Sequence, residues 1–196
     1  MENKRLEKQL EFALEVNKEK NIFRQTHVDS ERCENDAEHS WHIAVMIYLL
    51  REYANEEFDV AKAMLMALIH DVVEIDAGDT YAYDNNALST QKEREQAAAE
   101  RIFGILPQDQ KQEMILLFNE FEECRTPEAR FARVMDNLQP MMLNDKNNGA
   151  DWKRHNVAKS QIYKRNEKTP TGSAELWEFM KILVEQNIEK GTIRDE

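Results

Sequence analysis

A histidine and several acidic residues stand where an apolar run of the sequence ends. The run AMLMALI, residues 63 to 69, is followed by His70, Asp71, Glu74 and Asp79. On a helix, His70, Asp71 and Glu74 border one edge, so their side chains can converge. Such a group has the chemistry to bind a metal ion or to transfer a proton. A His-Asp pair alone is weak support, because it is more often a capped helix end or a surface pair.

A second histidine, His39, lies in the stretch ENDAEHSWHIAVM, at the start of a helix with an apolar face. Polar residues crowd this helix start. Taken alone, Asp36 and Glu38 complement the positive end of the helix dipole, and the histidines His39 and His42 are boundary residues. This stretch indicates a chemical site only when it is combined with the other polar stretches of the sequence.

A third stretch, FARVMDNLQP, places Asp136 within an apolar helical stripe. One reading is a carboxylate that pairs with Arg130 or Arg133. Taken together, the three stretches offer two imidazoles and two carboxylates from three separate helices. This mixed nitrogen and oxygen set suits Mn, Fe, Co, Ni, Zn or Mg. An octahedral ion so held keeps open positions for an activated water and for a substrate phosphoryl oxygen.

The elements that must position these residues are helices. Apolar residues recur at helical spacing almost throughout, and strand-like alternation is nearly absent. Asn35 with Glu38, and Thr126 with Pro127, are typical helix starts. We predict an all-α fold of about seven to nine helices in a single domain over residues 1 to 196. Its later helices are expected at about 89 to 103, 107 to 123, 127 to 146, 150 to 165 and 173 to 190, the C-terminal ones (150 to 190) packing on the rest.

Composition limits the class of partner. The chain has 196 residues and a formal net charge of -12, which repels nucleic acid polymers and anionic membranes. A small anionic substrate remains compatible, because one metal and one or two basic side chains reverse the charge locally. Cys33 and Cys124 lack metal-ligand spacing and are expected as reduced thiols. The start MENKRLEKQLEF lacks a signal-peptide core, so we expect a cytoplasmic protein.

The order of the three stretches resembles that of the HD-domain phosphohydrolases. Their signature is a His, then a His-Asp pair, then a distant Asp, as in AEHSWH (37 to 42), LIHDVVEIDAGD (68 to 79) and FARVMDNLQP here. Within that superfamily the chain is similar to the 5'-deoxynucleotidase branch, over roughly residues 22 to 155. No single stretch is specific, but their spaced combination is.

The resemblance implies roles for individual residues. It implies one divalent metal and these ligands: His39, His70, Asp71 and Asp136. Glu74 matches the residue that orients or deprotonates the attacking water, and Asp79 matches the acid that faces the leaving 5' oxygen. Arg24 matches the arginine that grips the phosphate. The implied activity is release of phosphate from a small substrate, most simply a nucleoside 5'-monophosphate, and the family resemblance implies a homodimer.

Other readings stay open at this stage. Gln25 departs from the family pattern, which has a Trp against the sugar, so selectivity for deoxyribose is not implied. The substrate could be a nucleoside triphosphate, an alarmone or a non-nucleotide phosphate. A non-catalytic module whose metal only joins the helices is a further alternative. Asp76, His42 and the cluster from Lys153 to His155 receive no defined role.

Overall fold

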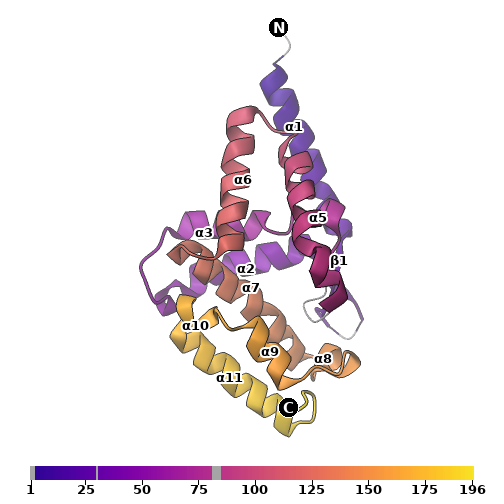
Figure 1. The fold of residues 1–196 in the computed structure, drawn as a ribbon, viewed down its shortest axis with the longest axis vertical. Coiled ribbons are helices and arrows are strands. Elements are labelled where there is room, and N and C mark those ends of the chain that lie inside the picture. The colour runs from indigo at the N-terminus through magenta and orange to yellow at the C-terminus, as the bar shows by residue number, and fades with distance from the viewer. Residues whose placement is uncertain (1–2, 30, 81–84) are drawn as a thin grey trace.

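The computed structural model describes residues 3–29, 31–80 and 85–196, except for the side chains of residues 85–88. The fold is all-α, as predicted (Figure 1). The helices are α1 (Lys4–Val16), α2 (Asp36–Leu50), α3 (Val60–Ile69), α4 (Glu74–Ala77), α5 (Asn85–Phe103), α6 (Gln108–Glu123), α7 (Pro127–Lys146), α8 (Ala150–Arg154), α9 (Lys159–Arg165), α10 (Thr169–Gly172) and α11 (Ala174–Glu189). The remaining elements are two 3-10 helices, η1 (Asn17–Asn21) and η2 (Arg51–Tyr53), and two strands, β1 (Phe23–His27) and β2 (Cys33–Asn35).

The helix count exceeds the predicted range because several short helices interrupt the connections. The single helix expected at 150 to 165 is wrong: α8 ends at Arg154 and α9 begins at Lys159. Asn156 between them has a φ of 53°, a left-handed conformation that a continuous helix does not contain. Helix α5 also begins at Asn85, earlier than expected.

Helices α2, α3 and α7 pack against one another at the centre of the molecule. Their fully buried side chains form the middle of the core: Ile43 and Ile47 of α2, Met66 of α3, and Phe131, Met135 and Leu138 of α7. Burial of each such side chain contributes about 1.5 to 3 kcal/mol. The three helices are therefore held in fixed positions relative to one another.

The starts of α2 and α7 follow the predicted capping patterns. Asn35 accepts a hydrogen bond from the backbone of Glu38, and the Glu38 side chain accepts one from the backbone of Asn35. The Thr126 hydroxyl accepts from the Ala129 backbone, and Pro127, the residue after Thr126, opens α7. These caps fix the axial position of the helices that carry His39 and Asp136.

A two-stranded antiparallel hairpin precedes α2 and was not predicted. Phe23 pairs with Asn35, and His27 pairs with Cys33. The strands are too short to show an alternation that sequence patterns can detect. The hairpin places Arg24 beside the start of α2, because Asn35 both ends β2 and caps that helix.

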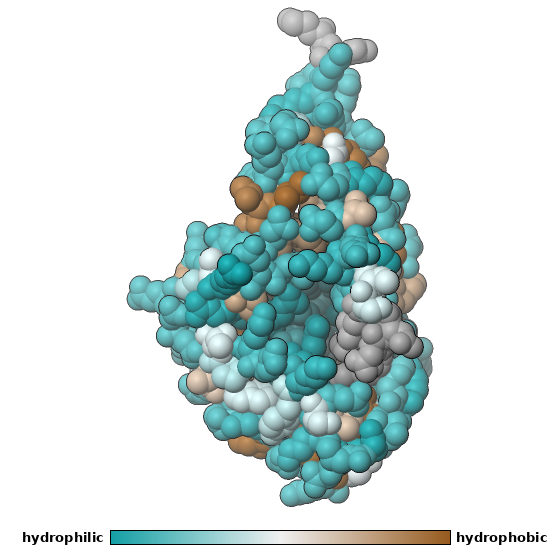
Figure 2. Space-filling view, in the orientation of Figure 1, coloured by the Kyte–Doolittle hydropathy of each residue, from teal (hydrophilic) through white to brown (hydrophobic). Residues whose placement is uncertain are grey.

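The molecule has two unlike ends. Helices α1, α5 and α6 extend to one end, and α8 to α11 form the other, with α2, α3 and α7 between them (Figure 1). On the face in Figure 2, hydrophilic residues surround a central hollow, and hydrophobic residues gather nearer the α1, α5 and α6 end. Across the described part of the chain, no helix has both the length and the hydropathy for a membrane span.

Candidate metal centre and active site

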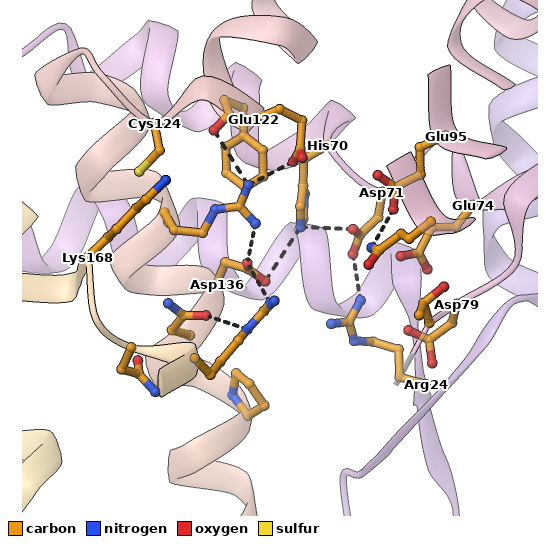
Figure 3. Close-up of a pocket in the computed structure, with 18 of the residues that line it drawn as sticks. Arg24, His70, Asp71, Glu74, Asp79, Glu95, Glu122, Cys124, Asp136 and Lys168 are labelled. Carbon is orange, nitrogen blue, oxygen red and sulfur yellow. Dashed lines mark hydrogen bonds and ion pairs between the residues drawn. The ribbon is translucent and has the colours of Figure 1, made fainter. Parts of the chain in front are cut away.

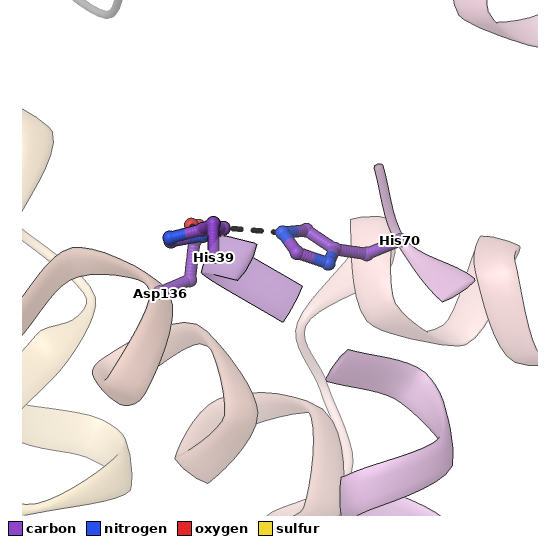
Figure 4. Close-up of side chains that lie close together, drawn as sticks. All are labelled: His39, His70 and Asp136. Carbon is purple, nitrogen blue, oxygen red and sulfur yellow. Dashed lines mark hydrogen bonds and ion pairs between the residues drawn. The ribbon is translucent and has the colours of Figure 1, made fainter. Parts of the chain in front are cut away.

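Three helices bring His39, His70 and Asp136 together (Figure 4). His39 comes from α2, His70 ends α3, and Asp136 lies in the middle of α7. The Asp136 Oδ1 atom is 3.2 Å from His39 Nε2 and 3.7 Å from His70 Nε2. All three side chains are buried, and one nitrogen or oxygen atom from each lies within 4.8 Å of the others. This cluster could hold a metal ion.

The hydrogen bonds of the two histidines show which ring nitrogen faces the cluster. His70 Nδ1 is 2.8 Å from the Ala67 carbonyl oxygen, which can only accept, so Nδ1 carries the proton. His70 Nε2 is buried and has no hydrogen-bond partner. Its lone pair is thus free to bind an ion, which supports the fit of a metal to this donor set.

His39 is oriented through a chain of two partners. Gln139 donates its amide to Glu34 Oε1 at 2.6 Å, which fixes the amide orientation. The Gln139 carbonyl oxygen then lies 3.0 Å from His39 Nδ1 and accepts its proton. His39 therefore also presents Nε2 to the cluster. Such outer partners set the tautomer and position of metal-binding histidines.

Charges around Asp136 keep its carboxylate ionised. Burial favours the neutral acid, but the hydrogen bond with His39 and the nearby His70 and Arg133 outweigh it and hold the pKa of Asp136 well below its usual range. Burial and Arg24 oppose the charged form of His39, yet its bonds to Asp136 and Glu34 raise its pKa to about 9. A divalent ion in this cluster would compete with a proton on His39 Nε2, so its binding would release that proton.

Asp71 borders this cluster and belongs to a second one. Its Oδ1 atom is 3.0 Å from His70 Nε2, and its Oδ2 atom is 3.9 Å from His39 Nε2. Ligand atoms of Asp36, Asp71 and Glu74 also lie within 4.8 Å of one another. Arg24 Nη1 neutralises part of this second cluster, at 2.6 Å from Asp71 Oδ2 and 3.5 Å from Asp36 Oδ1.

Glu74 and Asp79 are acids in a protected environment beside the metal cluster. Burial, and then the charge of Asp71, raise the pKa of Glu74 well above its usual range. Burial also raises the pKa of Asp79. Glu74 Oε2 is buried without a hydrogen-bond partner. Glu74 thus has unsatisfied capacity for a ligand or a proton.

A pocket of about 930 Å³ opens onto this arrangement (Figure 3). Its lining includes most of the predicted site residues: Arg24, His70, Asp71, Glu74, Asp79 and Asp136. His39 is fully buried beneath them. The structure thus brings all seven predicted residues to one place, and their individual roles remain predictions.

The sequence matches a known protein family over most of its length. The model of the HD domain family matches residues 16–177, which is most of the chain. The chain belongs to the HD-domain family. It is 44% identical to a crystal structure described as a predicted metal-dependent phosphohydrolase from Magnetospirillum magnetotacticum, with a TM-score of 0.92 over 97% of this chain and 96% of that one. The PH0347 protein from Pyrococcus horikoshii, at 24% identity and a TM-score of 0.63 over 89% of this chain and 97% of that one, shares the fold.

Curated relatives are more distant and are matched only in part. The chain is 30% identical over 121 residues to the 5'-deoxynucleotidase HDDC2 of Xenopus laevis, which covers 62% of this chain and 57% of that protein. The human protein of the same name is 27% identical over 112 residues, covering 57% and 53%. The HD-domain chain therefore spans about half the length of these relatives.

Several residues of this HD domain that contact the site were not assigned a site role from the sequence. Asp36 was read as a helix-dipole partner, yet it is fully buried against Arg24. Glu34 and Gln139, which hold His39, were missed. The acidic stretch before His39 was a signal for Asp36 and Glu34, but nothing local pointed to Gln139, which lies a hundred residues from His39.

Residues left without a role now have partners. Asp76 pairs with Arg101, whose Nη2 is 2.8 Å from Asp76 Oδ1. His42 Nδ1 lies 3.1 Å from the amide nitrogen of Gln139, the residue that orients His39. Among the described residues, the cluster from Lys153 to His155 is not part of the pocket lining.

The two candidate partners of Asp136 are also separated by the structure. Arg133 pairs with it, with 3.2 Å between Nη1 and Asp136 Oδ2. Arg130 instead pairs with Glu56, at 2.7 Å. Asp136 thus pairs with one of the two arginines named from the sequence, Arg133, and also takes part in the metal cluster.

Proposed function

We propose that this HD-domain chain is a metal-dependent phosphohydrolase that releases phosphate from small phosphomonoesters, with nucleoside 5'-monophosphates as the leading substrates. The observation that carries the proposal is the convergence of His39, His70 and Asp136 beneath a pocket that is also lined by Arg24 and Glu74. The names of the relatives in frog, human and Magnetospirillum agree with this chemistry.

In this proposal, His39, His70, Asp71 and Asp136 hold one divalent metal, either Mn, Co, Fe, Ni, Zn or Mg. When bound, the metal supplies a Lewis acid for the phosphoryl oxygen and lowers the pKa of an attacking water. Arg24 binds the phosphate and balances its charge. Its Nε atom is buried without a hydrogen-bond partner, so a donor is available for a phosphate oxygen.

In the proposal, Glu74 and Asp79 divide the proton transfers between them. Glu74 accepts a proton from the attacking water, since its unpaired Oε2 atom faces the same region as Asp71. The charge of Asp71 is one cause of the raised Glu74 pKa, and a cation held by Asp71 offsets that cause. Asp79, whose pKa is raised by burial, donates a proton to the leaving oxygen.

The test is phosphate release from a panel of phosphomonoesters by protein stripped of metal and then loaded with Mn, Co or Mg. We expect turnover only after loading, with nucleoside 5'-monophosphates among the best substrates. An unchanged rate in the chelated protein would contradict the mechanism. Loaded protein that is inactive on every phosphoester would favour a non-catalytic module.

We also propose that the protein acts in the cytoplasm as a homodimer. Free thiols at Cys33 and Cys124 are consistent with a reducing compartment. Trp41, Tyr48 and Leu49 of α2 are 64%, 54% and 60% exposed, and their spacing places them on one helix face. A second copy is the occupant we expect for this face. Light scattering should give a dimer, and Trp41→Ser should shift it toward monomer.

A further inference from the structure

The two walls of the pocket differ in charge. Figure 3 shows Asp71, Glu74, Asp79 and Glu95 on one side of His70, where Arg24 also lies. The other side is formed by α7, α9 and the turn before α10. It contributes the basic residues Arg133, Arg165 and Lys168 to the pocket lining, together with the acids Glu122, at the end of α6, and Glu167. We call these two sides the acidic wall and the basic wall.

Arg133 of the basic wall is neutralised by fixed partners. Its Nη1 is 3.2 Å from Asp136 Oδ2, and its Nη2 is 2.7 Å from Glu122 Oε1. Its guanidinium also stacks over the Phe121 ring, 3.9 Å from the centroid. This arginine therefore holds Asp136 in place and has little charge left for a ligand.

Arg165 reaches the same carboxylate oxygen from α9. Its Nη2 is 3.5 Å from Asp136 Oδ2, and its Nε donates to Asn137 Oδ1 at 3.1 Å. Asp136 thus offers one negative charge to two guanidinium groups. A divalent ion at Oδ1 draws on that same charge, which leaves Arg165 with excess positive charge at the pocket surface.

Lys168 follows Arg165 by three residues and lines the same pocket. Within the described residues, no hydrogen bond or ion pair of its ammonium group is found. In Figure 3 its side chain extends along the basic wall beside Cys124. Two incompletely neutralised cations therefore face one pocket in a chain whose net charge is -12.

We propose that Arg165 and Lys168 form a second anion subsite, and that among nucleoside 5'-phosphates those with a second phosphate group, besides the one that is released, are turned over best. The inference rests on the proposed phosphohydrolase function, and it adds small bisphosphates and diphosphates to the nucleoside 5'-monophosphates proposed above. A planar guanidinium and a mobile ammonium suit a phosphate. The pocket of about 930 Å³ has room for a nucleoside with two such groups.

The experiment compares kcat/KM for AMP, adenosine 3',5'-bisphosphate and ADP with metal-loaded protein. We expect at least one doubly phosphorylated substrate to exceed AMP by about tenfold. Lys168→Gln should remove that advantage and leave AMP within about twofold of wild type. The control is Lys164→Gln, which changes a neighbouring exposed lysine on α9 outside the pocket lining. Lys164→Gln should keep the advantage.

A binding measurement separates failure of the subsite from failure of the proposed function. By calorimetry, inorganic pyrophosphate should bind metal-loaded wild type more tightly than orthophosphate, and Lys168→Gln should lose the difference. This readout needs no turnover. Equal kcat/KM for AMP and both doubly phosphorylated substrates, equal binding of the two inorganic anions, or an equal loss on all substrates in Lys168→Gln would overturn the subsite. Absence of turnover with a retained pyrophosphate preference would overturn the function alone.

Discussion

The acidic and basic walls of the pocket are built in different ways. Most of the acidic wall comes from two short segments, the hairpin and the stretch from His70 to Asp79, and α5 adds Glu95, so its chemistry is concentrated in short motifs. The basic wall combines side chains from α7, α9 and the turn after it, which no motif links. Asp136 belongs to both, since Oδ1 faces the histidines and Oδ2 faces the arginines.

In our proposals the acidic wall serves the chemical step and the basic wall serves substrate recognition. The side chains proposed to bind the metal are buried, as is Glu74, whereas Asp79 is half-buried. His70 Nε2 and Glu74 Oε2 have no hydrogen-bond partner within the protein. Arg165 of the basic wall is more exposed, at 36% of its side chain. We expect changes in the acidic wall and the metal cluster to affect turnover of every substrate, and changes in the basic wall to affect the choice among substrates.

The largest effect should follow loss of the residue shared by the two walls. Asp136→Ala removes a proposed ligand and leaves the half-buried Arg133 with Glu122 as its remaining carboxylate, so metal binding and phosphate release should both fall below detection. Asp145→Asn, on the same helix but paired with Lys190, is the control. Metal content by mass spectrometry and circular dichroism would show whether the loss is local. Retained stoichiometric metal in Asp136→Ala would contradict the ligand assignment.

A large effect is also expected from the acidic wall alone. Glu74→Gln should lower kcat by about a hundredfold or more on every substrate, because a positioned general base contributes that much. Metal content should stay near wild type. Asp76→Asn, on the same short helix α4, changes the acid that pairs with Arg101 and should stay within about threefold. Equal losses in the two variants would remove the assigned role of Glu74.

An intermediate effect is expected from changing a residue that contacts the metal cluster without belonging to it. Gln139→Leu removes the acceptor of the His39 proton and leaves Glu34 without its amide partner. Metal affinity should fall by about tenfold to a hundredfold. Titration calorimetry with Mn would measure it. An unchanged affinity would mean that Gln139 serves packing and not the orientation of His39.

The acidic wall should also make stability depend on pH. Burial and the charges of Asp71 and Asp36 raise the pKa of Glu19, behind this wall, to about 8 from 4.5. The folded state then binds more protons than the unfolded state between these values, so Glu19 lowers stability as pH rises from 4.5 to 8. Glu19→Gln should stabilise metal-free protein at pH 8 by about 1 kcal/mol or more and have little effect at pH 4. Urea unfolding at both pH values would check the sign.

The smallest expected effect concerns how strongly the protein discriminates between ribose and deoxyribose in the substrate. Gln25 lines the pocket where the resemblance implies a Trp against the deoxyribose. Without an aromatic surface there, AMP and dAMP should differ in kcat/KM by less than about threefold, since a small contact in a binding site discriminates weakly. Gln25→Trp should increase the preference for dAMP. A strong deoxyribose preference in wild type would show that other residues read the sugar.

Much of this molecule follows from local sequence patterns. The apolar period predicted helices, and the Asn35 and Thr126 caps placed the starts of α2 and α7. The errors have local causes too. A left-handed residue, Asn156, divides a predicted helix, and the strands of the hairpin are too short to produce a clear alternation. The residues proposed for chemistry were all named beforehand, because a metal site requires unusual residue types in apolar surroundings.

The sequence by itself determined the all-α fold and the set of groups able to hold a metal. Only the tertiary structure decided that Gln139 orients His39 and that Arg165 and Lys168 face the same pocket as Glu74. The reason is physical. Helical spacing relates a residue to its neighbours three and four positions away, whereas contacts between residues a hundred positions apart depend on how complete helices pack.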